Sequence, residues 1–276
     1  MTLHINTITP THIISVSDRQ ISTSRGMLEL ADDRYKHLLL MTDDGAAIIS
    51  FAGFAGTITA DGQFERSTID WLTELCSETS RSGKHTIDAH LTDIRDQSKQ
   101  YIDEFRKKGI KPELLRLAIV ALGLCNNQQF TCVIDNCLEN YWLWSEKAKE
   151  TFTTRIRNHS EKDKFRDGYI TQVLGDERLA LKQRSFLKLL GIYARNNNPR
   201  KIFGTSVRII RAAATLSNGT IGTNCSGIRM TKNEPGIEVY NDRRTDAWEL
   251  VMPNSITSRT SMSVMVADIK GKKFNP

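Results

Sequence analysis

Two stretches decide the fold of this chain: MTLHINTITPTHIISVSDR, residues 1–19, and KHLLLMTDDGAAIISFAG, residues 36–53. Each holds two short apolar, β-rich runs, separated by Thr9-Pro10-Thr11 in the first stretch and by Asp43-Asp44-Gly45 in the second. Short apolar runs interrupted by Pro or by Asp-Gly are typical of antiparallel hairpins. We therefore expect four strands, at residues 3–8, 12–17, 36–41 and 46–52.

In the rest of the chain, segments whose apolar residues have a helical period alternate with segments that have the pattern of strands. Apolar residues spaced by a helical period predict two helices, one around residues 69–76 and one from Ile87 to Lys108. Two later helices are expected at 178–196 and 199–216, the second with Pro199 in its first turn. Alternating or continuous apolar runs predict the remaining strands, at 117–124, 130–136, 141–144, 220–230, 236–240 and 261–269. The highly charged residues 146–168 are expected to form an exposed connection.

The order of these blocks indicates the architecture. Pairs of helices alternate with groups of antiparallel strands, which favours an α+β fold, a four-layer αββα sandwich of two antiparallel sheets flanked by helices. A doubly wound sheet would alternate single strands with single helices, and this order does not. No internal repeat or linker divides the sequence, so we expect a single domain over residues 1–276.

Composition excludes several classes of protein. The chain has 276 residues, 39% of them apolar and 25% charged, which excludes collagen, low-complexity disorder and coiled coils. The net charge of +6 is mild, and the basic segments lack interleaved aromatic residues, so no nucleic-acid partner is expected. No apolar run is long enough to span a membrane and no signal peptide is recognised, so no membrane partner is expected. Five scattered cysteines fit reduced thiols in a cytoplasmic protein.

Common cofactor motifs are absent from the sequence. It contains no GxxxxGK[ST], GxGxxG, HExxH or CxxC, so neither a cofactor nor a metal is expected. His85 and His90 are five residues apart, a spacing that puts them on different faces of a helix. We expect both imidazoles to be solvated rather than to bind a metal.

The residue after the initiator methionine carries the first functional hint. Removal of Met1 would leave Thr2 with a free α-amino group, whose ordinary pKa is about 7.7–8.0. A good fraction of that amine is unprotonated near neutral pH and can accept the threonine hydroxyl proton. Thr2 would then be a nucleophile that carries its own base.

Four positions extend this pattern. Thr2 precedes a strand, Asp18 ends the run Ile13-Ile14-Ser15-Val16-Ser17-Asp18, Lys36 precedes the next strand, and Gly53 ends Phe51-Ala52-Gly53. In these residues the chain resembles the proteasome β-subunit and HslV branch of the N-terminal nucleophile (Ntn) hydrolases, as a divergent, bacterial-type member. The resemblance implies that Thr2 attacks, that Asp18 pairs with Lys36 beside the threonine, and that the Gly53 amide stabilises the oxyanion.

Physical chemistry explains these residue types. A lysine ammonium close to the α-amine lowers the pKa of that amine, and an aspartate keeps the lysine charged and oriented. A glycine amide can approach a developing oxyanion without a Cβ in the way.

The chain also departs from the family pattern. Lys36 lies further from Thr2 than is usual in the family, so Arg34 and His37 are alternatives for the lysine site. The family's Gly-Ser-Gly turn corresponds to Gly175-Asp176-Glu177, and its Asp-x-x-Ser-Gly turn is closest to residues 218–222, Asn-Gly-Thr-Ile-Gly. The serines of both turns and the aspartate of the second are therefore missing.

Three hypotheses of function follow. The first is a threonine-type Ntn hydrolase, a peptidase or amidase that cleaves peptide or other amide bonds through an acyl-enzyme on Thr2 and assembles as a homo-oligomeric ring. The second is a catalytically inactive, proteasome-like scaffold or binding subunit. Scaffold-type subunits carry extra residues before the first strand, which this sequence lacks, so the first hypothesis is favoured. The third is a basic nucleic-acid binder of unrelated function.

Overall fold

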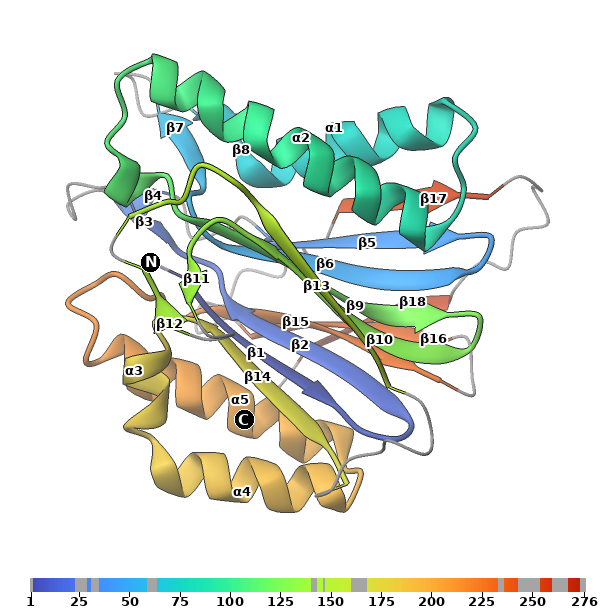
Figure 1. Cartoon of the computed structure of the whole chain (residues 1–276). Coiled ribbons are helices and arrows are strands. Elements are labelled where there is room, and N and C mark those ends of the chain that lie inside the picture. The colour runs from blue at the N-terminus through green and yellow to red at the C-terminus, as the bar shows by residue number, and fades with distance from the viewer. Residues whose placement is uncertain are drawn as a thin grey trace. The chain divides into compact units, whose positions relative to one another are not determined.

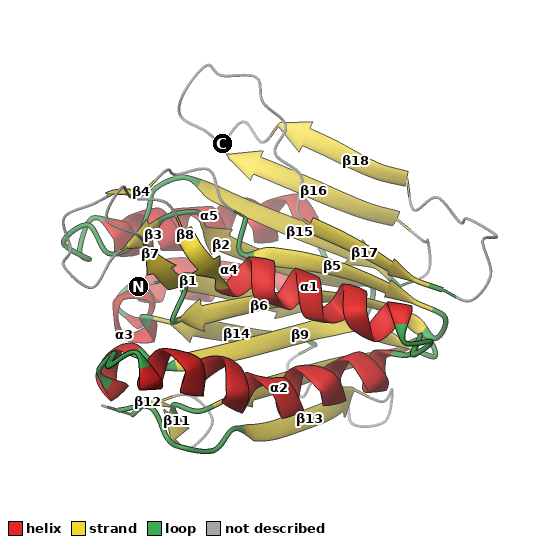
Figure 2. Ribbon diagram, turned by 90° about the horizontal axis from the view of Figure 1, so that it is seen from above, coloured by secondary structure: helices red, strands yellow, loops and turns green. Residues whose placement is uncertain are grey.

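The structure is a computed structural model of the chain (Figures 1 and 2). It describes residues 2–22, 29–30, 35–58, 64–139, 143–145, 147–159, 168–232, 236–242, 254–259 and 268–273. The chain forms two compact units, each with its own sheet, helices and core. Unit 1 comprises Met1–Lys36, Ser160–Pro253 and Val264–Pro276, and unit 2 comprises His37–His159 and Asn254–Ser263. The single domain expected over residues 1–276 stays a prediction.

Unit 1 is built on a six-stranded sheet in the order β14-β1-β2-β15-β16-β18. Its neighbouring strands are antiparallel except for the parallel pair β16 and β18. The strands are β1 (Leu3–Ile8), β2 (His12–Asp18), β14 (Ile170–Gly175), β15 (Cys225–Thr231), β16 (Gly236–Asp242) and β18 (Asp268–Lys273). A separate pair, β3 (Ile21–Ser22) and β4 (Glu29–Leu30), follows β2 along the chain.

Helices cover one face of this sheet. They are α3 (Glu177–Leu181), α4 (Arg184–Arg195) and α5 (Pro199–Ala214). Figure 1 shows α5 along the sheet with α4 packed on α5. The side chain of Asn198 caps α5 by accepting from the Lys201 amide at 3.1 Å. Apolar side chains of alternate positions in β1 and β2, such as Leu3 and Val16, pack with α5 residues in one buried core.

Unit 2 has a second six-stranded sheet in the order β13-β10-β9-β6-β5-β17. Only the pair of β17 and β5 is parallel among these strands. The strands are β5 (His37–Thr42), β6 (Gly45–Gly53), β9 (Leu117–Cys125), β10 (Gln128–Asp135), β13 (Thr153–His159) and β17 (Asn254–Ser258). Short pairs and one 3₁₀ turn complete the unit: β7 (Gly56–Ile58), β8 (Phe64–Ser67), η1 (Pro112–Leu114), β11 (Leu138–Glu139) and β12 (Leu143–Trp144).

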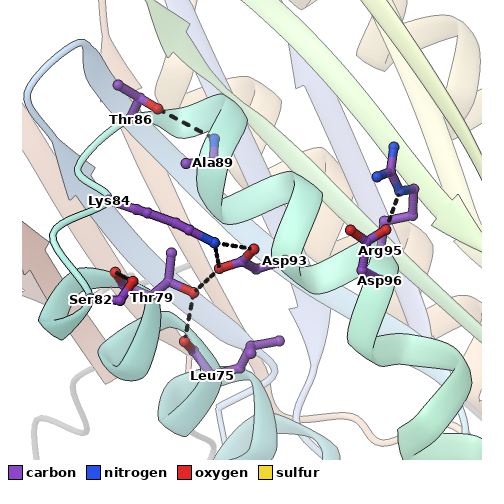
Figure 3. Close-up of polar contacts among 9 residues, drawn as sticks. All are labelled: Leu75, Thr79, Ser82, Lys84, Thr86, Ala89, Asp93, Arg95 and Asp96. Atoms are coloured by element: carbon purple, nitrogen blue, oxygen red, sulfur yellow. Dashed lines mark hydrogen bonds and ion pairs between the residues drawn. The ribbon is translucent and has the colours of Figure 1, made fainter.

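Two long helices, α1 (Thr68–Arg81) and α2 (Ile87–Lys107), pack on this second sheet. Ser67 and Thr86 cap them by accepting amide hydrogens through their hydroxyl groups. Figure 3 shows the corner between the helices, where Asp93 accepts from Lys84 Nζ at 2.9 and 3.0 Å and from Thr79 Oγ1 at 2.9 Å. These bonds fix the end of α1 to the second turn of α2.

The sequence prediction differs from the structure at several elements. Residues 153–159, expected within an exposed connection, form the edge strand β13. The helix expected at 178–196 is divided into α3 and α4, and the strand expected at 220–230 begins only at Cys225. Strand β17 was not predicted, and the strand expected at 261–269 falls mostly outside the described residues. Within the described part of the chain, no helix is long and apolar enough to cross a membrane.

The two histidines of the α1–α2 corner correct another expectation. His85 precedes α2, whereas His90 lies in its first turn and is fully buried. Both rings reach the Ser258 hydroxyl, His90 Nε2 at 3.0 Å and His85 Nδ1 at 3.2 Å. The prediction that both imidazoles are solvated is therefore wrong for His90, because that residue shares the apolar face of α2 with Leu91 and Ile94.

Burial lowers the pKa of His90 from 6.5 to about 4; the Asp93 and Asp44 carboxylates oppose this shift and His85 and Lys84 add to it. Between these two pH values the unfolded chain binds more protons than the folded one. The free energy of unfolding should therefore fall as the pH drops from about 6.5 to about 4, by roughly 2 kcal/mol between pH 7 and pH 4.5.

The variant His90→Gln should lose most of this dependence, because glutamine can keep a polar atom near Ser258 but does not titrate. Urea unfolding of His90→Gln and of the unmodified protein, each at pH 7 and pH 4.5, measures this change in unfolding free energy. Equal losses of stability in His90→Gln and in the unmodified protein would show that His90 is not the titrating group.

Candidate active site

Thr2 lies directly before β1 and is only 5% exposed. Its carbonyl oxygen accepts a hydrogen bond from the Asp176 amide at 3.3 Å. The neighbouring residue Gly175 pairs with Leu3 and has a φ of +108°, and a Cβ there would lie 1.7 Å from the Thr2 carbonyl oxygen. Gly175 is thus required both by its backbone conformation and by the closeness of Thr2.

Asp18 is the last residue of β2, the strand that pairs with β1, and it is fully buried. Its Oδ1 accepts from the Leu3 amide at 2.8 Å. Its Oδ2 accepts from Lys36 Nζ at 2.9 Å and from the Gly222 amide at 3.2 Å. Three segments far apart in the sequence therefore converge on one carboxylate, and a buried charge with such partners is compensated.

Lys36 supplies the opposite charge and is also fully buried. Besides Asp18, its ammonium donates to the backbone carbonyl of Gln20. Of the three candidates for the lysine site, the structure thus pairs Lys36 with Asp18. His37 belongs to β5 of unit 2, and Arg34 lies outside the described residues.

The geometry places a positive charge close to the start of the chain. The amide that follows Thr2 and the Lys36 ammonium bind the two oxygens of the same carboxylate. A cation held this way disfavours a second positive charge nearby, such as a protonated α-amine on Thr2. The arrangement can therefore tune a base at residue 2, although the catalytic roles of Thr2, Asp18 and Lys36 stay predictions.

Gly53 ends β6 in unit 2. It has a φ of +96°, and a Cβ there would lie 2.1 Å from the Arg116 carbonyl oxygen and 3.0 Å from Trp144 Cη2. Packing within unit 2 alone is enough to require glycine at this position. Its role in an oxyanion hole stays a prediction.

The two turns that lack the family's side chains make backbone contacts here. Asp176 donates its amide to Thr2, and Gly222 donates its amide to Asp18. Sequence reasoning singled out neither Gly222 nor Gln20, whose side-chain amide donates to the Gly219 carbonyl at 2.7 Å. The glycines of residues 218–222 were the only sequence signal, and they indicated a turn without indicating what the turn binds. No group of three or more His, Cys, Asp or Glu within the described residues could hold a metal ion.

Comparison with known proteins adds evidence on the fold. No protein-family model and no curated protein matches the sequence. Among solved structures, the chain is similar to Anbu (ancestral beta-subunit) from Yersinia bercovieri. The TM-score is 0.50 at 8% identity, and the match covers 82% of this chain and 80% of that one. A Gly-1 mutant of Anbu from Hyphomicrobium sp. strain MC1 matches at 8% identity with a TM-score of 0.42, over 83% of this chain and 80% of that one.

The likeness shows the fold. The α+β class, with two large sheets and helices packed on them, is as the sequence predicts. The assignment to the proteasome β-subunit and HslV family is wrong, because the solved structure that the chain resembles is an Anbu (ancestral beta-subunit) protein. The motif residues could mislead in this way because they reflect a fold that several families share.

Proposed function

We propose that this protein is a threonine-type Ntn hydrolase that cleaves peptide or other amide bonds through an acyl-enzyme on Thr2 after removal of Met1. The observation that carries the proposal is the buried Asp18–Lys36 ion pair, which is hydrogen-bonded to the residue that follows Thr2. Buried ion pairs are costly to desolvate and contribute little net stability, which favours a role for this pair other than stabilising the fold. The Ntn-type fold is consistent with this chemistry but does not establish it.

The proposed reaction has two stages. The Thr2 hydroxyl oxygen attacks the substrate carbonyl carbon while the α-amine takes the hydroxyl proton. A backbone amide donates to the oxyanion, the role that the sequence resemblance assigns to Gly53. Collapse of the tetrahedral intermediate breaks the C–N bond, and the α-ammonium returns its proton to the leaving amine. Water then attacks the ester carbonyl while the α-amine takes its proton. The C–O bond to Thr2 breaks, the α-ammonium returns the proton to the Thr2 oxygen, and the carboxylic acid leaves. Lys36 acts by keeping the α-amine unprotonated near neutral pH, and Asp18 holds Lys36 in place.

Two features of the proposal concern the surroundings of the enzyme. We also propose that copies of the chain assemble into a closed homo-oligomeric ring, in which apolar side chains exposed on α3 and α4, such as Leu181 at 55% and Ile192 at 46%, would be covered. None of the five cysteines, all of which lie within the described residues, forms a disulfide, which fits a reducing, cytoplasmic location.

Mass spectrometry of the full chain isolated from cells tests the proposal. We expect a denatured mass without Met1, a native mass that is a multiple of the chain mass, and one covalent adduct on Thr2 after treatment with an electrophilic β-lactone. Thr2→Ala should abolish the adduct. Thr7→Ala is the matched control, because it removes a buried hydroxyl from β1, the strand that follows Thr2, and should leave labelling unchanged.

The alternative function is the catalytically inactive scaffold or binding subunit. A protein that is folded and assembled, keeps Met1 and takes no adduct would overturn the hydrolase proposal and support the scaffold. A single-chain native mass at micromolar concentration would contradict the assembly.

A further inference from the structure

The turn that follows α5 reaches back to the buried ion pair. Within this turn, Thr220 donates its amide to the Ser217 carbonyl at 3.2 Å, and Ile221 donates its amide to the Ser217 hydroxyl at 3.1 Å. Asn218 and Gly219 have φ values of +50° and +80°. We call residues 217–222 the docking turn, because its last amide, that of Gly222, donates to Asp18 Oδ2.

Gln20 connects this docking turn to Lys36. Its side-chain amide donates to the Gly219 carbonyl at 2.7 Å, and its backbone carbonyl accepts from Lys36 Nζ. One residue therefore binds the docking turn through its side chain and the ammonium through its backbone. The preceding residue, Arg19, donates its amide at 2.9 Å to the carbonyl of Asn224, two residues beyond the docking turn.

The packing between Gln20 and the docking turn leaves no spare room. A Cβ on Gly222 would lie 2.6 Å from Gln20 Cβ and 3.2 Å from the backbone nitrogen of Gln20. The side chain of Gln20 is 9% exposed, so water competes little for its hydrogen bond. Gly222, which supplies the third donor of Asp18, therefore packs directly against Gln20.

We propose that Gln20 is a positioning residue that clamps the docking turn and thereby fixes Lys36 and Asp18 relative to Thr2. Without the clamp, Gly222 leaves Asp18 and the carboxylate holds Lys36 less tightly. The ammonium then lowers the pKa of the Thr2 α-amine less, because its electrostatic effect falls with distance and with access of water. This catalytic consequence rests on the proposed function, whereas the clamp itself does not.

The test compares Gln20→Met with Gln172→Met. Methionine keeps the length and the packing of glutamine but cannot donate to Gly219. Gln172 is a matched control, since it is a buried glutamine of the same unit in β14 and takes no part in the clamp. Hydrogen exchange over residues 217–222 should be about 2- to 10-fold faster in Gln20→Met than in Gln172→Met, as expected for the loss of one hydrogen bond. Unchanged exchange would overturn the clamp.

The second readout is the pH profile of β-lactone labelling on Thr2. In Gln20→Met the midpoint of the acid limb should move to higher pH, so that labelling at pH 7 falls about 3-fold or more, whereas Gln172→Met should keep the original midpoint. An altered exchange rate with an unmoved midpoint would overturn the positioning role. If the unmodified protein is not labelled, the proposed function fails, and the exchange experiment still decides on the clamp.

A second variant guards against misfolding of Gln20→Met. Gly222→Ala leaves Gln20 intact but pushes the docking turn away from it through the added Cβ. The variant should reproduce both the faster exchange and the shifted midpoint. Exchange and midpoint equal to those of Gln172→Met would overturn the proposal.

Discussion

Lys36→Met should reduce β-lactone labelling of Thr2 by a factor on the order of 10² to 10⁴. The substitution removes the cation that keeps the α-amine unprotonated and leaves the Asp18 carboxylate with amide donors but without its ion-pair partner. A buried charge that loses its partner commonly destabilises a protein by about 3–5 kcal/mol. Labelling rates and urea unfolding, measured on the same preparation, separate the two effects.

The double variant Asp18→Asn/Lys36→Met makes this prediction sharper. It removes both buried charges at once, so much of the lost stability should return. Labelling should stay as low as in Lys36→Met, because the cation is still missing. Recovered stability together with recovered labelling would show that the ion pair only supports the fold.

The alternative residues for the lysine site provide the controls. Arg34→Ala and His37→Gln should keep most of the labelling, since it is Lys36 that pairs with Asp18. If one of them abolished labelling while Lys36→Met retained it, the assignment of the cation would be wrong.

Strands β1, β2, β5 and β6 could be predicted because their signals are local. Pro10 and Gly45 mark turns between short apolar runs, and the structure has β1, β2, β5 and β6 at these places. The edge strand β13 could not be predicted in this way. Its Arg155 and Arg157 are polar, its side chains are largely exposed, and backbone bonds to β10 hold it in the sheet.

In the candidate site, too, the sequence identified some residues and only the structure identified others. Asp18 and Lys36 could be named from the sequence because the resemblance to the Ntn hydrolases implied them. Gln20 and Gly222 were not, because their contacts use backbone atoms and join segments about 200 residues apart. A backbone amide leaves no mark in the residue type, so only the folded chain identifies it as a donor.

Gly175→Ala should be the most damaging small substitution near Thr2. The added Cβ would lie 1.7 Å from the Thr2 carbonyl oxygen, which is backbone and cannot rotate away. Alanine is also strained at a φ of +108°. Because β14 and β1 pair at this point, the clash must either separate the strands or displace Thr2, and both outcomes remove the nucleophile from Asp18 and Lys36.

The variant Gly168→Ala is the control that separates the backbone strain of a positive φ from the steric clash with Thr2. Gly168 lies in the same unit with a φ of +79°, but a Cβ there meets only Arg195 Cγ, at 3.9 Å. This control should lose about 1–2 kcal/mol of unfolding free energy and keep its labelling, because it carries only the strain of a positive φ. Gly175→Ala should lose several kcal/mol more and nearly all labelling, as measured by urea unfolding and adduct mass. Equal stability and equal labelling of the two variants would show that β14 does not hold Thr2 in place, and the site would have to be positioned by Asp18 and Lys36 alone.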